Sequence, residues 1–444
     1  MIRRRDFLKN SLLGSSAALL VPSALWANPL SILGANDRIR VGLIGCNGMG
    51  FSDLTSFMRL PDIEVAALCD VDDRVLDRRE AQLVEAGRKK PARYGDYRKL
   101  LDQKDIDVVI IGTPDHWHCL QLVHALQAGK DVYCEKPVAN SIPEADYMLK
   151  SVRENDRMVQ IGQWQRSEPH FEDAIAFVHS GALGNIRMVK AWAYQGWMEP
   201  IPVLPDSPVP EGVDYTMWLG PAEQRPFNKN RFHFNFRWFW DYAGGLMTDW
   251  GVHLVDYALY GMKATDPQSV MATGGKFAYP DDASETPDTL QTVYEFDGFT
   301  LLWEHATGID GGNYGRNHGV AFIGNNGTLV LDRGGWEVIP EVEHESWRML
   351  RDQPKMEAVP LQASENSGLN RHTENFLQAV RTRDASILHA PMEVGYHAAR
   401  VCHMGNVAFK KEGKVLWDKE KGAFTDPGAN ALSRIQYHNG WMLP

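Results

Sequence analysis

A strand pattern followed at once by a glycine-rich turn constrains this chain more than any other feature. Residues 38–45 read RIRVGLIG, an apolar run rich in β-branched residues that predicts a strand. A helical pattern follows it and ends near residue 60. The turn between them contains Gly45, Asn47, Gly48, Met49 and Gly50. Such glycines allow the backbone to approach a phosphate closely, and the helix N-terminus offers free N–H groups to it. The turn departs from G-x-G-x-x-G at Asn47, whose side chain could crowd the phosphates.

An acidic residue stands where a dinucleotide site needs one. A second apolar strand over residues 64–69 ends at Asp70, twenty residues after Gly50. A carboxylate at this position can accept hydrogen bonds from the adenine ribose hydroxyls, and it would repel a 2′-phosphate. The spacing therefore predicts NAD rather than NADP as the cofactor. A solvated carboxylate at a strand end is the alternative interpretation of Asp70.

The order of the remaining patterns predicts two domains with different sheets. In the first half, strands over 107–112, 131–134 and 158–162 alternate with helices over 73–86, 96–102, 120–128 and 141–155, which is typical of a Rossmann doubly wound parallel sheet. In the second half, strands over 186–194, 291–296, 300–304, 319–323 and 328–332 follow one another, and helices are expected over 168–180, 241–260, 370–382 and 393–411. This order predicts a C-terminal α+β domain with an open, mainly antiparallel sheet. The fold class is thus α/β, with an NAD-binding domain over 38–162, a substrate-binding and oligomerisation domain over 163–420 and a tail over 421–444.

The first 27 residues have the pattern of a targeting segment. The run Arg4-Arg5-Asp6-Phe7-Leu8-Lys9 resembles the R-R-x-F-L-K core of twin-arginine export signals, and an apolar run over 11–25 follows it. That run is too short to span a bilayer. We expect a signal peptide over 1–27, a linker over 28–37, a periplasmic or exported location and no stable membrane insertion. A cytoplasmic tail is the alternative.

Composition excludes several other classes of protein. Of 444 residues, 44% are hydrophobic and 23% charged, which is the balance of a globular protein. A net charge of -11 argues against nucleic-acid binding, because phosphate backbones need clustered Lys and Arg. The five cysteines form no CxxC pair and no zinc-like spacing with histidine, so we expect no metal site and no disulfide framework.

An ordered set of loop motifs makes the prediction more specific. After the turn and Asp70 come Tyr94-Gly95-Asp96-Tyr97, Thr113-Pro114-Asp115-His116-Trp117-His118 and Glu135-Lys136-Pro137, and together they resemble the Gfo/Idh/MocA oxidoreductase family. The resemblance implies that the last two loops line the nicotinamide end of the cofactor. It also implies a homo-oligomer, a dimer or tetramer, formed through the open sheet face. The cofactor contacts expected in these and neighbouring loops are Thr113, Pro114, Trp117, His118, Glu135, Lys136 and Gln165.

A second motif lies in the C-terminal half. Residues 244–256 match the family signature G-G-x-x-x-D-x-G-x-H-x-x-D, whose first Asp and His act on substrate, which assigns those roles to Asp249 and His253. Their i,i+4 spacing places both side chains on one face of an expected helix, and Asp256 falls on nearly the same stripe. A surface ion pair is the alternative for an isolated D-x-x-x-H.

Oxidation of a secondary alcohol removes a hydride from carbon and a proton from oxygen. His253, with an ordinary imidazole pKa near ~6.5, can accept the proton. Lys136 can donate a hydrogen bond to the developing alkoxide, while Asp249 orients the hydroxyl and the imidazole. Lys136 is the alternative base, which would require its charged form to be destabilised.

Tryptophan is concentrated where the substrate is expected, which favours a small-molecule carbohydrate as the partner. Aromatic faces pack against the C–H faces of sugars, although packing of an insertion or an interface is the alternative. The tryptophans of residues 161–260 are Trp164, Trp192, Trp197, Trp218, Trp238, Trp240 and Trp250, and the expected hydroxyl partners are Gln163, Gln165, Arg166, His170, Asn235 and Arg237.

Export would deprive the protein of a soluble NAD pool, so we expect the dinucleotide to stay bound and to be regenerated in each cycle. This permits net oxidation of a sugar, but also an NAD-dependent glycoside hydrolase, lyase or epimerase that works by transient oxidation of a hydroxyl. Relatives of the α-N-acetylgalactosaminidase type carry Y-P-T-H-G where this chain has residues 247–251, MTDWG, which favours the ordinary oxidoreductase site. A non-catalytic sugar-binding protein that retains NAD is a further alternative.

Overall fold

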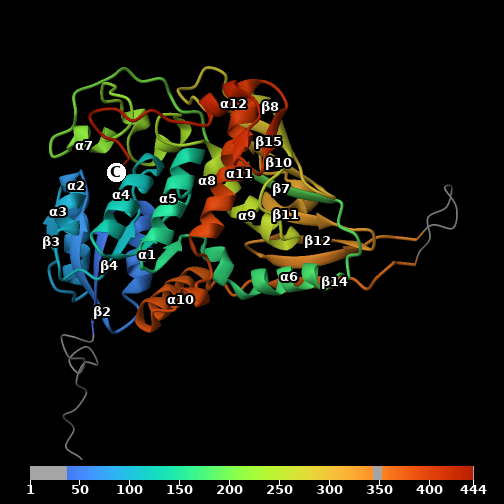
Figure 1. Cartoon of the computed structure of the whole chain (residues 1–444), viewed down its shortest axis with the longest axis horizontal. Helices are drawn as coiled ribbons and strands as arrows, with labels where there is room; N and C mark the ends of the chain where they lie inside the picture. The colour runs from blue at the N-terminus through green and yellow to red at the C-terminus, as the bar shows by residue number, and fades with distance from the viewer. Residues whose placement is uncertain (1–37, 344–352, 444) are drawn as a thin grey trace, which may run out of the picture. The chain divides into compact units, whose positions relative to one another are not determined.

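The computed structural model describes residues 38–343 and 353–443, so the expected signal peptide over 1–27 and nearly all of the linker over 28–37 lie outside the described residues. The described chain forms two sheets, drawn in Figure 1 in blue to green for the first and in green to orange for the second. Both sheets belong to one compact unit that begins at Ile39.

The first sheet is parallel throughout, as the alternating pattern predicted. Its strand order is β3-β2-β1-β4-β5-β6, the doubly wound order in which a ligand crevice opens beyond the carboxyl ends of the central strands. The continuous apolar run of β4 is buried on both faces because helices cover the sheet from both sides. The strands are β1 (Ile39–Ile44), β2 (Ile63–Cys69), β3 (Ala92–Tyr94), β4 (Val108–Ile111), β5 (Asp131–Cys134) and β6 (Val159–Ile161). The helices are α1 (Gly48–Phe57), α2 (Asp73–Glu85), α3 (Tyr97–Leu101), α4 (Asp115–Gln127) and α5 (Ile142–Glu154).

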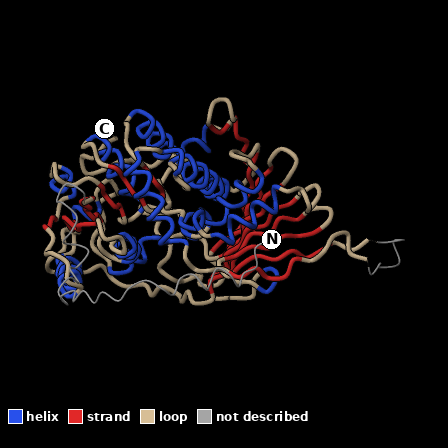
Figure 2. Tube along the Cα trace, turned by 90° about the horizontal axis from the view of Figure 1, so that it is seen from below, coloured by secondary structure: helices blue, strands red, loops and turns tan. Residues whose placement is uncertain are grey.

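The second sheet has ten strands and is antiparallel except for the pair β7 and β10, which confirms the prediction of a mainly antiparallel sheet. Alternating burial along β9 shows that one face packs on the core. Figure 2 shows the helices gathered against these strands. The strands are β7 (Met188–Gln195), β8 (Ser269–Gly275), β9 (Thr289–Glu295), β10 (Thr300–Thr307), β11 (His318–Ile323), β12 (Gly327–Asp332), β13 (Gly335–Pro340), β14 (Val359–Ala363), β15 (Val415–Asp418) and β16 (Ala423–Phe424). The helices are α6 (Pro169–His179), α7 (Tyr215–Leu219), α8 (Leu246–Asp249), α9 (Gly251–Met262), α10 (Gly368–Thr382), α11 (Met392–Lys411) and α12 (Pro427–Leu432).

Two late helices join the halves of the molecule. Helix α10 lies beside α1 (Figure 1), where Ser56 Oγ is 2.9 Å from Asn370 Oδ1 and the rings of Phe57 and Phe376 are 5.9 Å apart. Helix α11 packs closely against the first domain at Gly395, where an added Cβ would lie 2.5 Å from a methyl group of Val138. These contacts hold the carboxyl ends of the parallel strands against the second half of the chain.

Three elements differ from their predicted form. The helix expected over 241–260 is two helices, because the chain breaks at Trp250 between α8 and α9. Helix α4 begins at Asp115 rather than near residue 120, since Pro114 sets the extended backbone that precedes its first turn. The expected tail over 421–444 contains β16 and α12, and Trp441 packs edge-on against Trp117 at 4.9 Å.

Aromatic residues give the insertion after β7 a core of its own. This cluster buries Trp218 and Trp238 together with Phe232, Phe236 and Tyr242. Trp192 is buried in the second sheet, whereas Trp197 is 58% exposed. Of the seven concentrated tryptophans, Trp192, Trp218 and Trp238 are thus buried in packing. Those that line the cavity described below are Trp164, Trp218 and Trp250.

The close approach of helix α1 to the end of strand β1 can be tested by substitution. A Cβ added at Gly50 would lie 2.3 Å from the carbonyl oxygen of Gly45, and neither backbone can move without disturbing β1. We expect Gly50→Ala to lower the free energy of unfolding by roughly 1–3 kcal/mol in urea denaturation. The matched control is Gly311→Ala, where no atom lies within 4 Å of the added carbon, and we expect a change within about 0.5 kcal/mol. Equal midpoints for Gly50→Ala and wild type would contradict this account.

Candidate active site

A cavity of about 760 Å³ lies beyond the carboxyl ends of the parallel strands. Its wall comes from both halves of the chain, including the glycine turn, the loops after β4 and β5, the break between α8 and α9, and the turn between β12 and β13. The predicted site residues in this wall are Gly45, Asn47, Gly48, Met49, Asp70, Thr113, Pro114, Trp117, Glu135, Lys136, Asp249 and His253. The topology therefore brings residues more than 200 positions apart to one site.

The glycine turn leaves room for a phosphate. Gly45 and Gly48 have φ values of +84° and +45°, which favour glycine, and no atom lies within 4 Å of the position of a Cβ on Gly48. Asn47 instead has an ordinary φ of −99°, and its Oδ1 accepts a hydrogen bond of 3.0 Å from Arg78. The hydrogen bond to Arg78 orients the Asn47 side chain, which lines the cavity, and its effect on the phosphates stays a prediction.

Asp70 lies at the end of β2 beside this turn. Its carboxylate accepts hydrogen bonds from the backbone N–H groups of Cys46 (2.8 Å) and Asp72 (3.1 Å). Burial raises the pKa of Asp70 to about 6, although these N–H groups favour its charged form. The open Gly48, the uncapped start of α1 and the Asp70 carboxylate together fit a dinucleotide, with phosphates at the turn and a ribose at Asp70.

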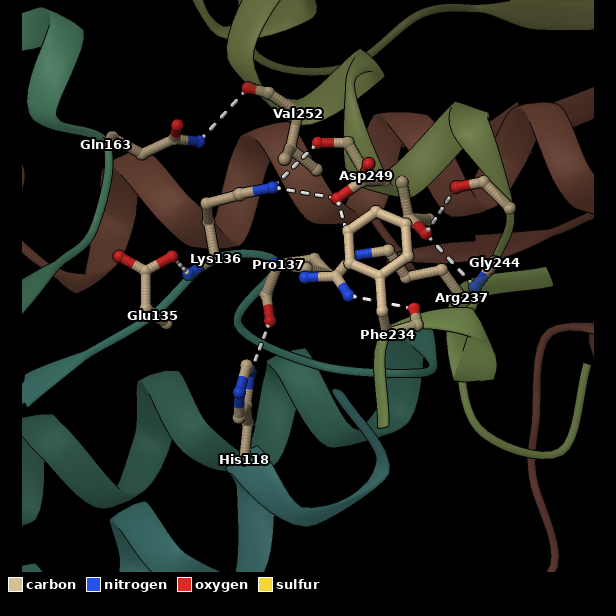
Figure 3. Close-up of polar contacts among 12 residues, drawn as sticks. His118, Glu135, Lys136, Pro137, Gln163, Phe234, Arg237, Gly244, Asp249 and Val252 are labelled. Atoms are coloured by element: carbon tan, nitrogen blue, oxygen red, sulfur yellow. Dashed lines mark hydrogen bonds and ion pairs between the residues drawn. The ribbon is translucent and has the colours of Figure 1, made fainter. Parts of the chain in front are cut away.

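Lys136, Arg237 and Asp249 form a charged cluster in the cavity (Figure 3). Lys136 Nζ donates to the Asp249 carbonyl oxygen at 2.9 Å and to its Oδ1 at 3.0 Å, and Arg237 Nε donates to the same Oδ1 at 3.1 Å. Burial by itself would raise the pKa of Asp249, but the two cations outweigh it and lower this pKa to about 2. Asp249 is therefore a carboxylate at every physiological pH.

His253 lies in the cavity wall close to this cluster. It is only 5% exposed, and its Nδ1 has no hydrogen-bond partner among residues 38–343 and 353–443. Burial, together with the nearby positive charges of Lys136 and Arg333, lowers the pKa of His253 well below its usual value. The expectation of an unperturbed imidazole is wrong, and at neutral pH His253 is uncharged.

Several carboxyl groups near the cavity resist ionisation. Burial raises the pKa of Asp115 to about 8 and that of Glu135 to about 7, even though Lys136 and Arg237 favour their charged forms. Burial and the neighbouring Glu135 also raise the pKa of Asp53, on helix α1. At pH 7 this part of the site therefore carries less negative charge than its sequence indicates.

Some predicted contacts lie behind the cavity wall. His118 is on helix α4, and its ring lies between two carbonyl oxygens. That of Pro137 is 2.6 Å away (Figure 3), and that of Thr113 is 2.8 Å away. Gly50 is buried against Gly45, and Gln165 is buried outside the wall. These three residues lie outside the cavity wall, where His118 and Gly50 shape the neighbouring loops, and their contact with the cofactor stays a prediction.

The expected hydroxyl partners are mostly engaged elsewhere. Arg166 makes a bidentate ion pair with Asp256 at 2.9 and 2.6 Å, so the last aspartate of the signature is a structural residue. Gln163 donates to the Val252 carbonyl oxygen at 3.0 Å (Figure 3), and His170 contacts the Asp332 carbonyl oxygen at 2.9 Å. Neither Asn235 nor His170 lines the cavity, whereas Arg237 does.

Several cavity residues were not predicted from the sequence, and His233 and Arg333 are among them. His233 lies 3.1 Å from the Asp72 carboxylate, and Arg333 occupies the turn between β12 and β13. Neither stands in a recognisable motif, and only the fold brings them to the loops of the first domain.

Two negative findings concern the described residues alone. No helix within 38–343 and 353–443 is long and apolar enough to cross a membrane. In the same part of the chain, no group of three or more His, Cys, Asp or Glu side chains is arranged to hold a metal ion. The five cysteines all fall in that part and are free and buried.

Comparison with known proteins identifies both halves of the chain. A family model described as "Oxidoreductase family, NAD-binding Rossmann fold" matches residues 39–163. A second, described as "Oxidoreductase family, C-terminal alpha/beta domain", matches residues 176–443. The prediction of a Rossmann domain with NAD as its cofactor is confirmed.

Individual proteins resemble this chain either over a short stretch or at low sequence identity. A glycosyl hydrolase family 109 protein of Shewanella baltica is 36% identical over 163 residues, which cover 32% of this chain and only 35% of that protein. Levoglucosan dehydrogenase in complex with NADH and levoglucosan has a TM-score of 0.61 at 20% identity, over 85% of this chain and 99% of that one. Aldose-aldose oxidoreductase from Caulobacter crescentus complexed with glycerol has a TM-score of 0.62 at 19% identity, also over 85% and 99%. At these identities the two structures show that the fold is shared.

The role of Asp70 gives a prediction about pH. Ribose hydroxyls donate to a carboxylate, so protonation of Asp70 should weaken cofactor binding as the pH falls through about 6. We expect Asp70→Asn to bind NADH roughly tenfold more weakly at pH 8, with less dependence on pH, as measured by fluorescence titration. The control is Asp77→Asn, an exposed carboxylate paired with Arg93, which should leave NADH affinity unchanged. A wild-type affinity that stays constant between pH 5 and 8 would contradict the assignment.

Proposed function

Because the chain belongs to the Gfo/Idh/MocA oxidoreductase family, we propose that it is an NAD-dependent oxidoreductase acting on a secondary hydroxyl of a sugar or sugar derivative. One observation carries this proposal: the ammonium of Lys136 and the imidazole of His253, from different domains, line the same cavity as the dinucleotide turn. The cavity tryptophans Trp164 and Trp250 favour a carbohydrate.

Bound NAD would accept the hydride that leaves the carbon of the alcohol. Lys136 is ion-paired with Asp249 and therefore donates hydrogen bonds rather than accepting them. Two of its N–H groups point at Asp249, and the third remains to donate to a substrate hydroxyl. That hydrogen bond stabilises the negative charge that develops on oxygen as the hydride leaves.

His253 is the group best suited to take the hydroxyl proton. It is uncharged at neutral pH, so a ring nitrogen has a free electron pair, and its Nδ1 is without a partner among the described residues. Its lowered pKa makes it a weak base, which suits transient acceptance of a proton and its later release. Asp249 holds Lys136 and Arg237 in place and takes no part in proton transfer, because a pKa of about 2 makes its carboxylate a very weak base.

The first test separates catalysis from cofactor binding. We expect Lys136→Ala to lower sugar-dependent hydride transfer at least roughly 100-fold, because one charge-stabilising donor is lost, and His253→Ala to do the same by removing the base. Both should still bind NADH, as measured by fluorescence titration. The matched control is Lys150→Ala, which removes an exposed lysine on α5. Unchanged turnover in both site variants would refute the catalytic roles, and bound NAD without turnover in wild type would favour the sugar-binding alternative.

A redox-neutral reaction is the second candidate, and the match to glycosyl hydrolase family 109 proteins favours it. In such a reaction, oxidation of a ring hydroxyl acidifies the neighbouring C–H, and elimination or epimerisation follows before the hydride returns. The match spans about a third of those proteins, so their chemistry stays a proposal for this chain.

One experiment distinguishes the oxidoreductase from the redox-neutral reaction. Purified protein would be incubated with sugars and p-nitrophenyl glycosides without added NAD, while absorbance at 340 nm and phenol release are followed. We expect the signal at 340 nm to rise with a reducing substrate and to fall with an acceptor, as in an ordinary oxidoreductase. Phenol release without net NADH would establish the redox-neutral candidate instead.

We also propose export through the twin-arginine pathway, with the dinucleotide retained, on the motif at Arg4 and Arg5. A homo-oligomer formed through the second sheet is a related proposal. The exposed apolar side chains of that sheet support it, namely Met188, Met271, Val293, Ile339 and Leu361.

A further inference from the structure

Arg333 is a cavity residue with an unusual environment. It occupies the turn between β12 and β13 and reaches the same cavity as Lys136 and His253. Its guanidinium carbon lies 5.0 Å from the ring centre of Trp164 and 4.7 Å from that of Trp250. Two indole rings thus fix the position of this cation, as cation–π contacts do when they orient a side chain for recognition.

No carboxylate of the described chain contacts this charge, although Asp249 attracts it from a distance. Other arginines around the site have carboxylate partners: Arg237 pairs with Asp249, and Arg166 pairs with Asp256. Arg333 makes no ion pair or hydrogen bond with residues 38–343 and 353–443, and its Nε is buried without a partner. Burial accordingly lowers its pKa. A half-buried cation that no carboxylate contacts is incompletely compensated, so the arrangement fits a site that is completed by a ligand anion.

The net charge of the groups around Arg333 is also positive. Lys136, Arg237 and Arg333 contribute three positive charges, and Asp249 is the carboxylate that two of them share. Asp115, whose pKa burial raises to about 8, is mostly protonated at pH 7. Glu135, whose pKa burial raises to about 7, is only partly ionised, so the two offset only part of the remaining positive charge. A neutral sugar would leave this end of the cavity with a surplus of positive charge.

The dinucleotide phosphates are not the missing anion. They belong at the glycine turn after β1, whereas Arg333 contacts Trp164 and Trp250 and lies close enough to His253 to lower its pKa. Arg333 therefore faces the end of the cavity where the substrate is proposed to bind.

We infer that the substrate of this site is an acidic sugar whose anionic substituent, a carboxylate or a sulfate ester, pairs with Arg333. This inference rests on the proposed function, since it concerns the substrate of the same site. The planar fork of a guanidinium matches two oxygens of either group, while the flanking indoles offer faces to the sugar ring.

The test compares matched acidic and neutral sugars on the full chain loaded with NAD. Binding of glucuronate, galacturonate and glucose 6-sulfate would be measured by calorimetry against glucose and galactose. We expect at least one acidic sugar to bind at least tenfold more tightly than its neutral counterpart. Whether the uronates or glucose 6-sulfate bind more tightly will identify the anionic substituent. Arg333→Gln should weaken that acidic sugar roughly 10- to 100-fold and its neutral counterpart less than roughly threefold.

Two further variants show whether the effect of Arg333→Gln comes from the lost guanidinium. Arg333→Lys retains the charge but loses the fork, so an intermediate affinity is expected in a protein that folds normally. Arg371→Gln removes an arginine of α10 that is exposed, paired with Glu365 and outside the cavity wall, and it should leave all affinities unchanged. Equal binding of acidic and neutral sugars, or no binding of any acidic sugar, would overturn the inference.

Failure of the inference and failure of the proposed function give different results. Reduction of NAD by neutral sugars that does not depend on Arg333 would overturn the acidic substrate and leave the oxidoreductase standing. Binding of an acidic sugar that depends on Arg333, with no signal at 340 nm and no turnover, would support the inference and refute the proposed function.

Discussion

The ion pair between Lys136 and Asp249 connects the two halves of this protein at the point where they form a cavity. Lys136 follows β5 at the carboxyl edge of the parallel sheet, and Asp249 ends α8 in the second half. Arg237, from the aromatic insertion, binds the same carboxylate oxygen. A loop of the first domain thus meets two nearby segments of the second at one carboxylate, and removal of Asp249 would leave two partly buried cations without compensation.

Burial then decides the charge of almost every other group in the cavity. The same low-dielectric surroundings keep His253 uncharged, raise the pKa values of Asp115 and Glu135 to about 8 and about 7, and lower the pKa of Arg333. Asp249 is the exception, because two cations contact it directly. The site thereby presents hydrogen-bond donors and positive charge to a ligand, which suits a reaction that develops negative charge on oxygen.

Local sequence predicted the first domain well because its signals are local. The glycine turn, the spacing to Asp70 and the alternating strands all act within about 30 residues, and the parallel sheet follows from them. The sequence predictions were wrong where one local pattern is compatible with two backbone structures. The segment containing His118 was interpreted as a loop lining the cofactor site, yet it forms the start of α4, and the ring turns inward to join Thr113 and Pro137. The helix expected around Asp249 is interrupted at Trp250, which helical periodicity does not reveal.

The sequence by itself determined the fold class, the cofactor and the identity of the lysine, aspartate and histidine that line the site, because motifs with fixed spacing encode them. The tertiary structure alone decided their electrical state and their neighbours. Whether an imidazole is charged depends on burial and on nearby cations, and Arg333 lies near His253 only because helix α9 packs on the second sheet. Such contacts join residues far apart in the chain, so no window of sequence contains them.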